Sequence, residues 1–146
     1  MTLDRARIEA LIPQQGTMCL IDRVDFWDGQ RIICCTMQHA ALTNPLRTPE
    51  GLSSLHGIEF AAQAMAVHGG LTATDLPRPR VGLLLSARDC VFHRRRLDDI
   101  VGQLIVEAEL LGNHEGTRLY RFKVSKADQA LVEGRAAVMM RDGGPP

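Results

Sequence analysis

The segment GLSSLHGIEFAAQAMAVHGG, residues 51–70, consists almost wholly of apolar and small side chains, and Glu59 is its one formally charged residue. As a helix, it would project His56, Glu59 and Gln63 from one side. A neighbouring stripe would be fully apolar, and a helix that is apolar nearly all round is a buried one. The segment therefore predicts one long central helix that the rest of the chain covers.

Glu59 needs an explanation on such a helix. Burying an ionised carboxylate without partners costs several kcal/mol, roughly, so the group must be paired, protonated or facing a cavity. Two interpretations are open. Glu59 forms a structural salt bridge with a buried arginine, or it is a desolvated carboxyl group that exchanges a proton during catalysis.

Composition limits the possible classes of protein. A chain of 146 residues fits a single domain, residues 1–146, with a core large enough to need no metal or disulfide. The 17 basic residues balance the 17 acidic ones, and only 4% of residues are aromatic, which argues against a nucleic-acid partner. Charged residues near the N-terminus argue against a signal peptide, and the polar residues of segment 51–70 argue against a membrane span.

The four cysteines lack the spacing of a metal site or a disulfide framework. We expect reduced thiols in a reducing compartment, no metal, no cofactor and a cytoplasmic location. His68 and His114 have no partner at metal-site spacing, and we expect both at the surface.

Strand-like segments flank the central helix. We expect a short helix over residues 3–11 and a hairpin turning at Asp28-Gly29. A loop over 38–50 leads to a helix that begins either at Thr48-Pro49 or at Ser53 or Ser54, and Gly69-Gly70 would end it. We expect strands at residues 18–26, 31–37, 81–91, 104–110, 119–125 and 131–140, with apolar residues alternating in 104–110 and 119–125. Residues 75–80, with two prolines, should form a connecting loop, and residues 142–146 a frayed tail. The order predicts an α+β fold.

Four stretches of the chain carry a resemblance to known proteins, LIPQQGTMCLIDRV (11–24), IEFAAQAMA (58–66), LDDIVGQLIVEAELL (97–111) and VEGRAAVMM (132–140). All four resemble one family, the bacterial 3-hydroxyacyl-acyl-carrier-protein dehydratases of hot-dog fold. The second matches the family's Glu-x-x-Ala-Gln motif at Glu59, Ala62 and Gln63. The variant HGIEFAAQAMAVHG (56–69) is most similar to dehydratase-like proteins of aryl polyene synthesis. The resemblance implies a curled antiparallel sheet wrapped around one long central helix.

The resemblance also implies a reaction, the dehydration of a carrier-bound 3-hydroxyacyl thioester to the 2-enoyl thioester in fatty-acid or polyketide-like synthesis. A helix carboxylate, here Glu59, would act at the C3 oxygen, and a histidine would move the C2 proton. Gln63 would orient Glu59 or bind the substrate, and Gly57 lies where helix amides would meet the thioester carbonyl. A homodimer would build the site from two chains.

The chain departs from the family pattern where the histidine is expected. Asn44-Pro45-Leu46-Arg47 occupies that stretch, which makes Asn44 a candidate substrate contact rather than a base. His39 and His56 are the remaining candidates, and we prefer His39, because His56 shares a helix face with Glu59. The departure keeps two alternatives open, an acyl thioesterase and a non-catalytic acyl-binding or assembly subunit.

The run His93-Arg94-Arg95-Arg96 has two interpretations. It is a solvated face, or its arginines dock the acidic surface and prosthetic-arm phosphate of an acyl carrier protein.

Overall fold

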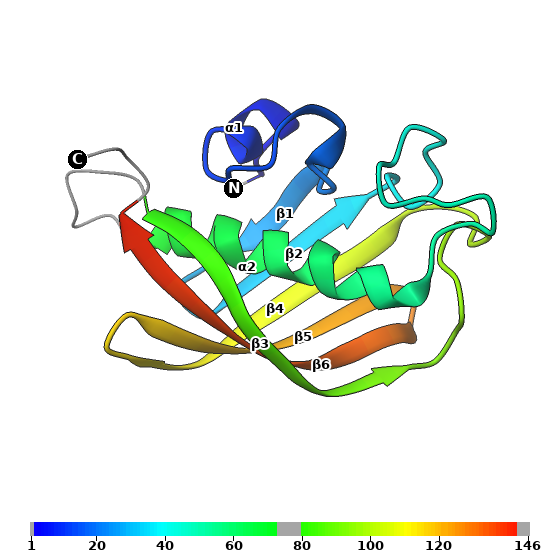
Figure 1. The fold of residues 1–146 in the computed structure, drawn as a ribbon. Helices are drawn as coiled ribbons and strands as arrows, with labels where there is room; N and C mark the ends of the chain where they lie inside the picture. The colour runs from blue at the N-terminus through cyan, green and yellow to red at the C-terminus, as the bar shows by residue number, and fades with distance from the viewer. Residues whose placement is uncertain (1, 73–79, 143–146) are drawn as a thin grey trace.

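The computed structural model describes residues 2–72 and 80–142. The central helix, α2 (Gly57–Thr72), lies across the concave face of one curled antiparallel sheet, and the short helix α1 (Arg5–Glu9) lies near the first strand (Figure 1). This arrangement confirms the predicted α+β fold with a sheet wrapped around one long helix.

The sheet has the strand order β1-β2-β4-β5-β6-β3 in the described chain. The strands are β1 (Arg23–Trp27), β2 (Arg31–Thr36), β3 (Arg80–Phe92), β4 (Leu104–His114), β5 (Thr117–Lys126) and β6 (Gln129–Asp142). β3 follows the helix in sequence yet pairs with the last strand, so the sheet closes over α2 from both sides. β1 and β3 are its two edges.

Cross-strand register explains the two faces of the sheet. Val106 pairs with Val124 and Ala108 with Phe122, and all four side chains are buried toward α2. The intervening pair, Glu107 and Lys123, faces outward. The alternation predicted over 104–110 and 119–125 is thereby confirmed, because successive residues of a strand point to opposite faces.

The central helix begins after the expected start at Thr48-Pro49 and ends after the expected end at Gly69-Gly70. Ser53 caps the 3-10 turn η2 (Ser54–His56), its side chain accepting from the Leu55 N–H, and α2 follows directly. A helix start at Thr48-Pro49 is wrong and the Ser53 alternative is confirmed. Gly69-Gly70 does not end the helix. Gly69 lies inside it, and the absence of a Cβ there leaves room for the end of the Met140 side chain of β6.

The segment before β1 also differs from the expectation. Residues 16–18 form a 3-10 turn, η1 (Gly16–Met18), and the first strand begins only at Arg23. Cys19, Leu20 and Ile21 are nevertheless fully buried. These residues are apolar because the irregular segment that they form is buried. The pattern of apolar residues along the sequence cannot distinguish such a segment from a buried strand. Of the loop expected over 75–80 and the tail expected over 142–146, residues 75–79 and 143–146 lie outside the described residues. Arg80 belongs to β3 and Asp142 to β6.

His68 is buried, with no exposed surface, and the expectation that it lies at the surface is wrong. Arg118 donates to the Tyr120 hydroxyl at 3.2 Å, and that hydroxyl lies 2.8 Å from His68 Nδ1. His68 Nε2 lies 2.8 Å from the Asp28 carbonyl, which only accepts. Nε2 therefore carries the proton and Nδ1 accepts from Tyr120. This chain of bonds fixes α2 to β5 and to the β1–β2 turn.

Burial lowers the pKa of both His39 and His68, which sets a pH dependence of stability. In the unfolded chain these histidines have a pKa of about 6.5. Below that value the unfolded state binds more protons, so the free energy of unfolding should fall as the pH drops from about 7 to about 5. Denaturant titrations at several pH values measure this slope.

A matched pair of variants locates the effect. His68→Gln should reduce the pH slope more than His114→Gln does, because His68 is fully buried whereas the His114 side chain is 90% exposed. Equal slopes in the two variants would contradict the assignment.

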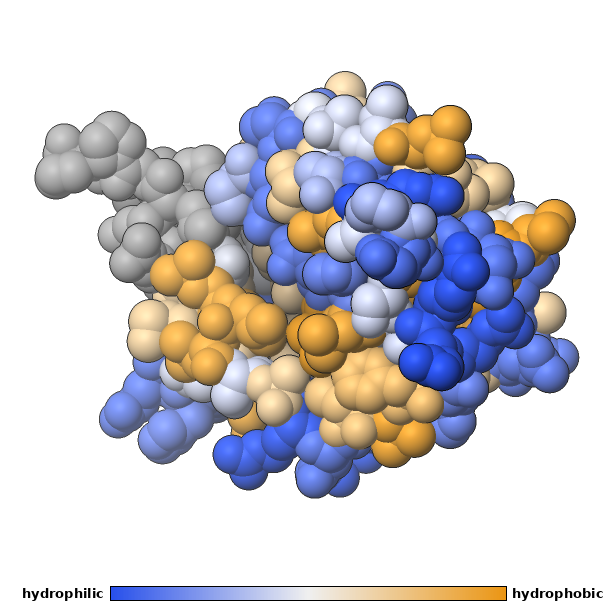
Figure 2. Space-filling model, turned by 45° about the vertical axis from the view of Figure 1, so that its right-hand side comes forward, coloured by the Kyte–Doolittle hydropathy of each residue, from blue (hydrophilic) through white to orange (hydrophobic). Residues whose placement is uncertain are grey.

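The β3 edge is long and partly apolar. Four large side chains of this 13-residue strand are exposed, Leu84 (40%), Leu85 (52%), Val91 (48%) and Phe92 (39%). In Figure 2, the face that includes this edge carries a band of hydrophobic side chains low in the view, with a hydrophilic area beside it. In the described chain no strand pairs with the outer side of β3. Such an edge is a template for pairing with another chain.

Candidate active site

Glu59 lies in the first turn of α2 and is half-buried. Gln63, one turn later, donates from Nε2 to Glu59 Oε1 at 3.0 Å and to the Met18 carbonyl at 2.9 Å. Its Oε1 accepts from the Leu20 N–H at 2.8 Å. Because a backbone N–H only donates, this bond fixes which end of the amide is oxygen. Gln63 is 1% exposed, and its side-chain amide is fully hydrogen-bonded, to Glu59 and to the backbone of Met18 and Leu20.

The salt-bridge interpretation of Glu59 is not supported by the described residues, in which no arginine, lysine or histidine lies within ion-pair distance of its carboxylate. The first turn of a helix favours a negative charge by the helix dipole. Of the two roles expected for Gln63, the geometry is that of a residue that orients Glu59.

His39 follows β2 in a turn, and its ring is fully buried. Nε2 lies 3.0 Å from the Ile100 carbonyl, so Nε2 carries the proton. Nδ1 then holds a free lone pair, and this atom is buried with no hydrogen-bond partner. Burial, the largest effect, lowers the pKa of His39 and keeps the ring neutral at pH 7. A neutral imidazole with an unoccupied lone pair is the form that a general base requires.

One buried segment connects Glu59 to the turn that carries His39. The Leu20 N–H donates to Gln63, and the Leu20 carbonyl accepts from Thr36 Oγ1 at 2.5 Å. Thr36 Oγ1 in turn accepts from the Gln38 N–H at 2.9 Å. The carboxylate and the imidazole are therefore both positioned by the residues around Leu20.

Asn44 lies in the loop after His39 and is 4% exposed. Its Nδ2 donates to the Gln38 carbonyl at 2.9 Å, and its Oδ1 accepts from the Leu46 N–H at 2.9 Å. In the family pattern this stretch supplies the histidine. In this chain Asn44 occupies the stretch, and its hydrogen bonds join the two ends of the loop that contains His39.

His56 and Gly57 lie at the junction of η2 and α2. The His56 side chain is half-buried, and within residues 2–72 and 80–142 it has no hydrogen bond or ion pair. Gly57 lets α2 approach β6, because a Cβ there would lie 2.8 Å from Val132 Cγ2. The Gly57 N–H already bonds within the 3-10 turn, so its visible role is close packing.

Two of the three candidate docking arginines are paired locally. Arg96 donates to Asp98 through Nε at 3.0 Å and Nη2 at 2.5 Å, and Arg94 donates to Asp99 at 3.3 Å. The Asp98 side chain, 3% exposed, also accepts from the Leu52 N–H, and these bonds hold the pKa of its carboxyl well below the usual range. Arg95 is exposed, and its carbonyl accepts from the Ser54 N–H.

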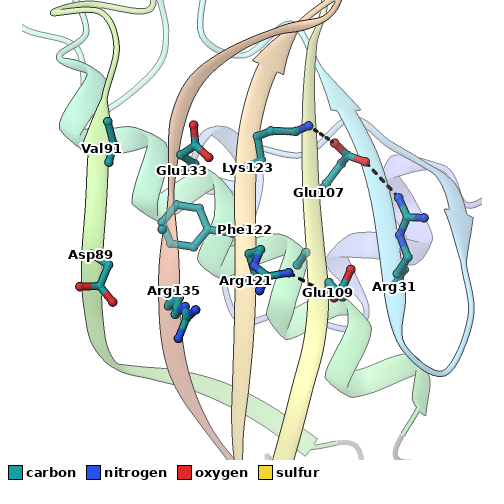
Figure 3. A pocket seen from close by; sticks show the side chains of 12 residues that line it. Arg31, Asp89, Val91, Glu107, Glu109, Arg121, Phe122, Lys123, Glu133 and Arg135 are labelled. Atoms are coloured by element: carbon teal, nitrogen blue, oxygen red, sulfur yellow. Dashed lines mark hydrogen bonds and ion pairs between the residues drawn. The ribbon is translucent and has the colours of Figure 1, made fainter.

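A depression of about 430 Å³ lies on the opposite, outer face of the sheet (Figure 3). Charged side chains line it, and Glu107 contacts both Arg31 at 3.3 Å and Lys123 at 3.6 Å. None of the predicted site residues is part of this lining. In the described residues no cluster of three or more His, Cys, Asp or Glu could hold a metal ion.

Comparison with solved structures identifies the fold. The dehydratase heterocomplex ApeI:P from Xenorhabdus doucetiae superposes with a TM-score of 0.80 over 93% of this chain and 91% of that chain, at 20% identity. A mutant thioesterase from Staphylococcus aureus gives a TM-score of 0.59 over 81% and 91%, at 15% identity. A Haemophilus influenzae thioesterase gives 0.60 over 84% and 78%, at 12% identity. The fold is the hot-dog fold shared by dehydratases and thioesterases.

The family is narrower than the fold. The model of the ApeP-like family, described as ApeP dehydratase, matches residues 6–143, and the chain belongs to this family. No curated protein sequence matches the chain. No described helix is long and apolar enough to cross a membrane.

Two residues that hold the segments around the candidate site escaped the sequence analysis. Asp98 fixes the approach to α2 through Leu52, and Asp22 contacts the turn that precedes His39. Both lie inside stretches that resemble the dehydratases, LIDRV and LDDIV, and that resemblance was the available signal. Their partners are backbone groups 46 and 15 residues away, which spacing along the sequence cannot reveal.

Proposed function

We propose that this protein dehydrates a 3-hydroxyacyl thioester to the 2-enoyl thioester. The observation that carries the proposal is the Glu59 carboxylate held by Gln63 on the central helix of an ApeP-like dehydratase family member. Fold alone would allow other thioester chemistry, since thioesterases share it. The carboxylate and the neutral imidazole supply the acid and the base that elimination of water needs.

The reaction divides between the two groups. His39 Nδ1 takes the proton from C2, and the electrons of that C–H bond form the C2–C3 double bond. The C3–O bond breaks, and Glu59 in its acid form gives a proton to the departing hydroxyl, which leaves as water. No cofactor enters this balance. His56 is the second candidate for the base, since its ring is half-buried whereas His39 is enclosed in the single chain.

The substrate, in this proposal, is delivered by an acyl carrier protein. The support is the exposed Arg95 guanidinium beside the start of α2, where the backbone of Arg95 bonds to Ser54. Arg94 and Arg96 contribute less free charge, because Asp99 and Asp98 pair with them. The four free cysteines fit a reducing compartment, so we place the reaction in the cytoplasm.

Assays with two thioesters separate this activity from its alternatives. From 3-hydroxybutyryl thioester a dehydratase produces enoyl absorbance, and from crotonyl thioester it removes that absorbance by hydration. A thioesterase instead frees thiol from both compounds. A non-catalytic acyl-binding subunit changes neither signal, and either of these outcomes would overturn the proposal.

Assembly through β3 is part of the proposal. The apolar edge strand is a surface on which a second hot-dog chain can continue the sheet, and the related ApeI:P protein is a heterocomplex. The partner is a second copy of this chain, as a homodimer, or a related chain in its place.

We expect Leu85→Arg to shift purified protein from dimer to monomer, because it places a charge on the paired edge. Leu119→Arg is the matched control, since Leu119 is equally exposed at 52% but lies on the interior strand β5. Sedimentation velocity measures both. A wild-type chain that is monomeric alone and dimeric only with a related chain would select the heteromeric form. Dimers in Leu85→Arg as stable as in wild type would exclude the β3 edge.

A further inference from the structure

Asp22 is a junction between the N-terminal helix and the turn that carries His39. Its Oδ2 accepts from the Met37 N–H at 2.6 Å, and its Oδ1 accepts from Gln38 Nε2 at 2.8 Å. Both donors immediately precede His39 in the chain. The carboxylate therefore holds the backbone and a side chain of the turn from which the imidazole projects.

Arg5 fixes Asp22 from the other side. Arg5 Nη1 donates to Asp22 Oδ1 at 3.0 Å, and Nη2 donates to the carbonyls of Gly16 and Cys19, each at 2.7 Å. The guanidinium thus ties α1 and the buried segment 16–21 to the same carboxylate. The Asp22 N–H bonds to the Cys35 carbonyl of β2 at 3.1 Å, which fixes the backbone of Asp22 as well.

This arrangement leaves the His39 turn held at three places. Asp22 holds Met37 and Gln38, Thr36 Oγ1 holds the Gln38 N–H, and Asn44 holds the Gln38 carbonyl. Asp22 is the member of the set that also brings a charge close to the ring. The charged groups acting on His39 are the carboxylates of Asp22 and Asp98, and both raise its pKa against the larger, lowering effect of burial.

We propose that Asp22 is a positioning residue for His39, holding the turn so that Nε2 meets the Ile100 carbonyl and the lone pair of Nδ1 stays unbonded. The inference rests on the proposed function, in which His39 is the base. Asp22 touches no reacting atom. Its loss should lower kcat with little change in KM, because misplacing a catalytic group by about 1 Å can cost ~10²-fold in rate.

Asp22→Asn is the informative variant. The Asp22 carboxylate accepts from three donors, the Arg5 and Gln38 side chains and the Met37 N–H. An asparagine must therefore turn its NH₂ group toward at least one donor. We expect kcat for dehydration to fall ~10²-fold. The acid limb of the kcat/KM profile should also move to lower pH, because one of the two carboxylates that raise the His39 pKa is gone.

Asp25→Asn is the matched control. Asp25 pairs on the surface with Arg23 at 2.5 Å and should tolerate the change without loss of activity or a shifted profile. Denaturant titration of both variants separates loss of positioning from loss of folding. If Asp22→Asn is unfolded, Gln38→Met, which removes one donor and leaves Asp22 charged, should still lower kcat.

A double mutant distinguishes the inference from the function on which it rests. If Asp22 acts through His39, adding Asp22→Asn to His39→Gln should cause no further loss, since residues acting as a unit are non-additive. Full activity of His39→Gln would defeat the proposed base. A His39→Gln variant with strongly reduced but measurable kcat, together with a fully active Asp22→Asn or an additive double mutant, would overturn only the role of Asp22.

Discussion

Replacing Glu59 with glutamine should lower turnover by about 10²–10⁴-fold, the usual cost of losing a general acid or base. The variant should fold normally. Gln63 Nε2 can still donate to the new side-chain oxygen, and no ion pair with a described residue is lost. Steady-state kinetics on a 3-hydroxyacyl thioester measures the loss, and a denaturant titration measures the stability.

Glu50→Gln is the control for Glu59→Gln. Glu50 is exposed ahead of the helix, accepts from Thr48 Oγ1 at 3.0 Å and should be replaced without effect. Wild-type turnover in Glu59→Gln would remove the carboxylate from the mechanism. An unfolded Glu59→Gln would instead assign this residue to stability.

His39→Gln should cause a loss of the same order, about 10²–10⁴-fold in kcat. A glutamine amide can replace Nε2 as donor to the Ile100 carbonyl, so the turn keeps this bond. The basic lone pair at Nδ1 is lost. Because burial lowers the His39 pKa, the fall of wild-type kcat/KM that reports protonation of His39 should lie below the ordinary pKa of histidine, about 6.5.

His56→Gln is the comparison that selects the base. With His39 as the base, His56→Gln should lower kcat far less than His39→Gln. The reverse order would transfer the role to His56, which lies directly ahead of α2. The measurement is kcat for both variants on one thioester.

Much of this site was predictable from the local sequence. The i, i+4 spacing of Glu59 and Gln63 predicts contact on a helix, and the structure confirms it with a 3.0 Å hydrogen bond. The alternation in β4 and β5 likewise predicts the buried face, because side chains of a strand alternate with a period of two. Both are properties of a single element.

The parts that could not be predicted depend on contacts between distant segments. His68 looks like a polar residue near a helix end, yet Tyr120 and the Asp28 carbonyl satisfy its ring inside the core. Gly69 looks like a helix terminator, but its missing Cβ makes room for Met140. In each case a tertiary contact overrides a local preference.

The buried state of His39 has the same origin. In the sequence it is a histidine at the end of a strand. In the structure the Ile100 carbonyl, 61 residues later, meets its ring and leaves Nδ1 free. Only the arrangement of the loops before α2 and β4 brings these groups together.

The most direct test of the dehydratase assignment is the time course of enoyl absorbance when wild-type protein, with its partner chain if it needs one, meets a carrier-bound 3-hydroxyacyl thioester. The account predicts a rise to an equilibrium that is also reached from the enoyl thioester, without release of thiol, and a rate lowered by about 10²–10⁴-fold in Glu59→Gln. A flat trace, or release of thiol with no enoyl product, would contradict it.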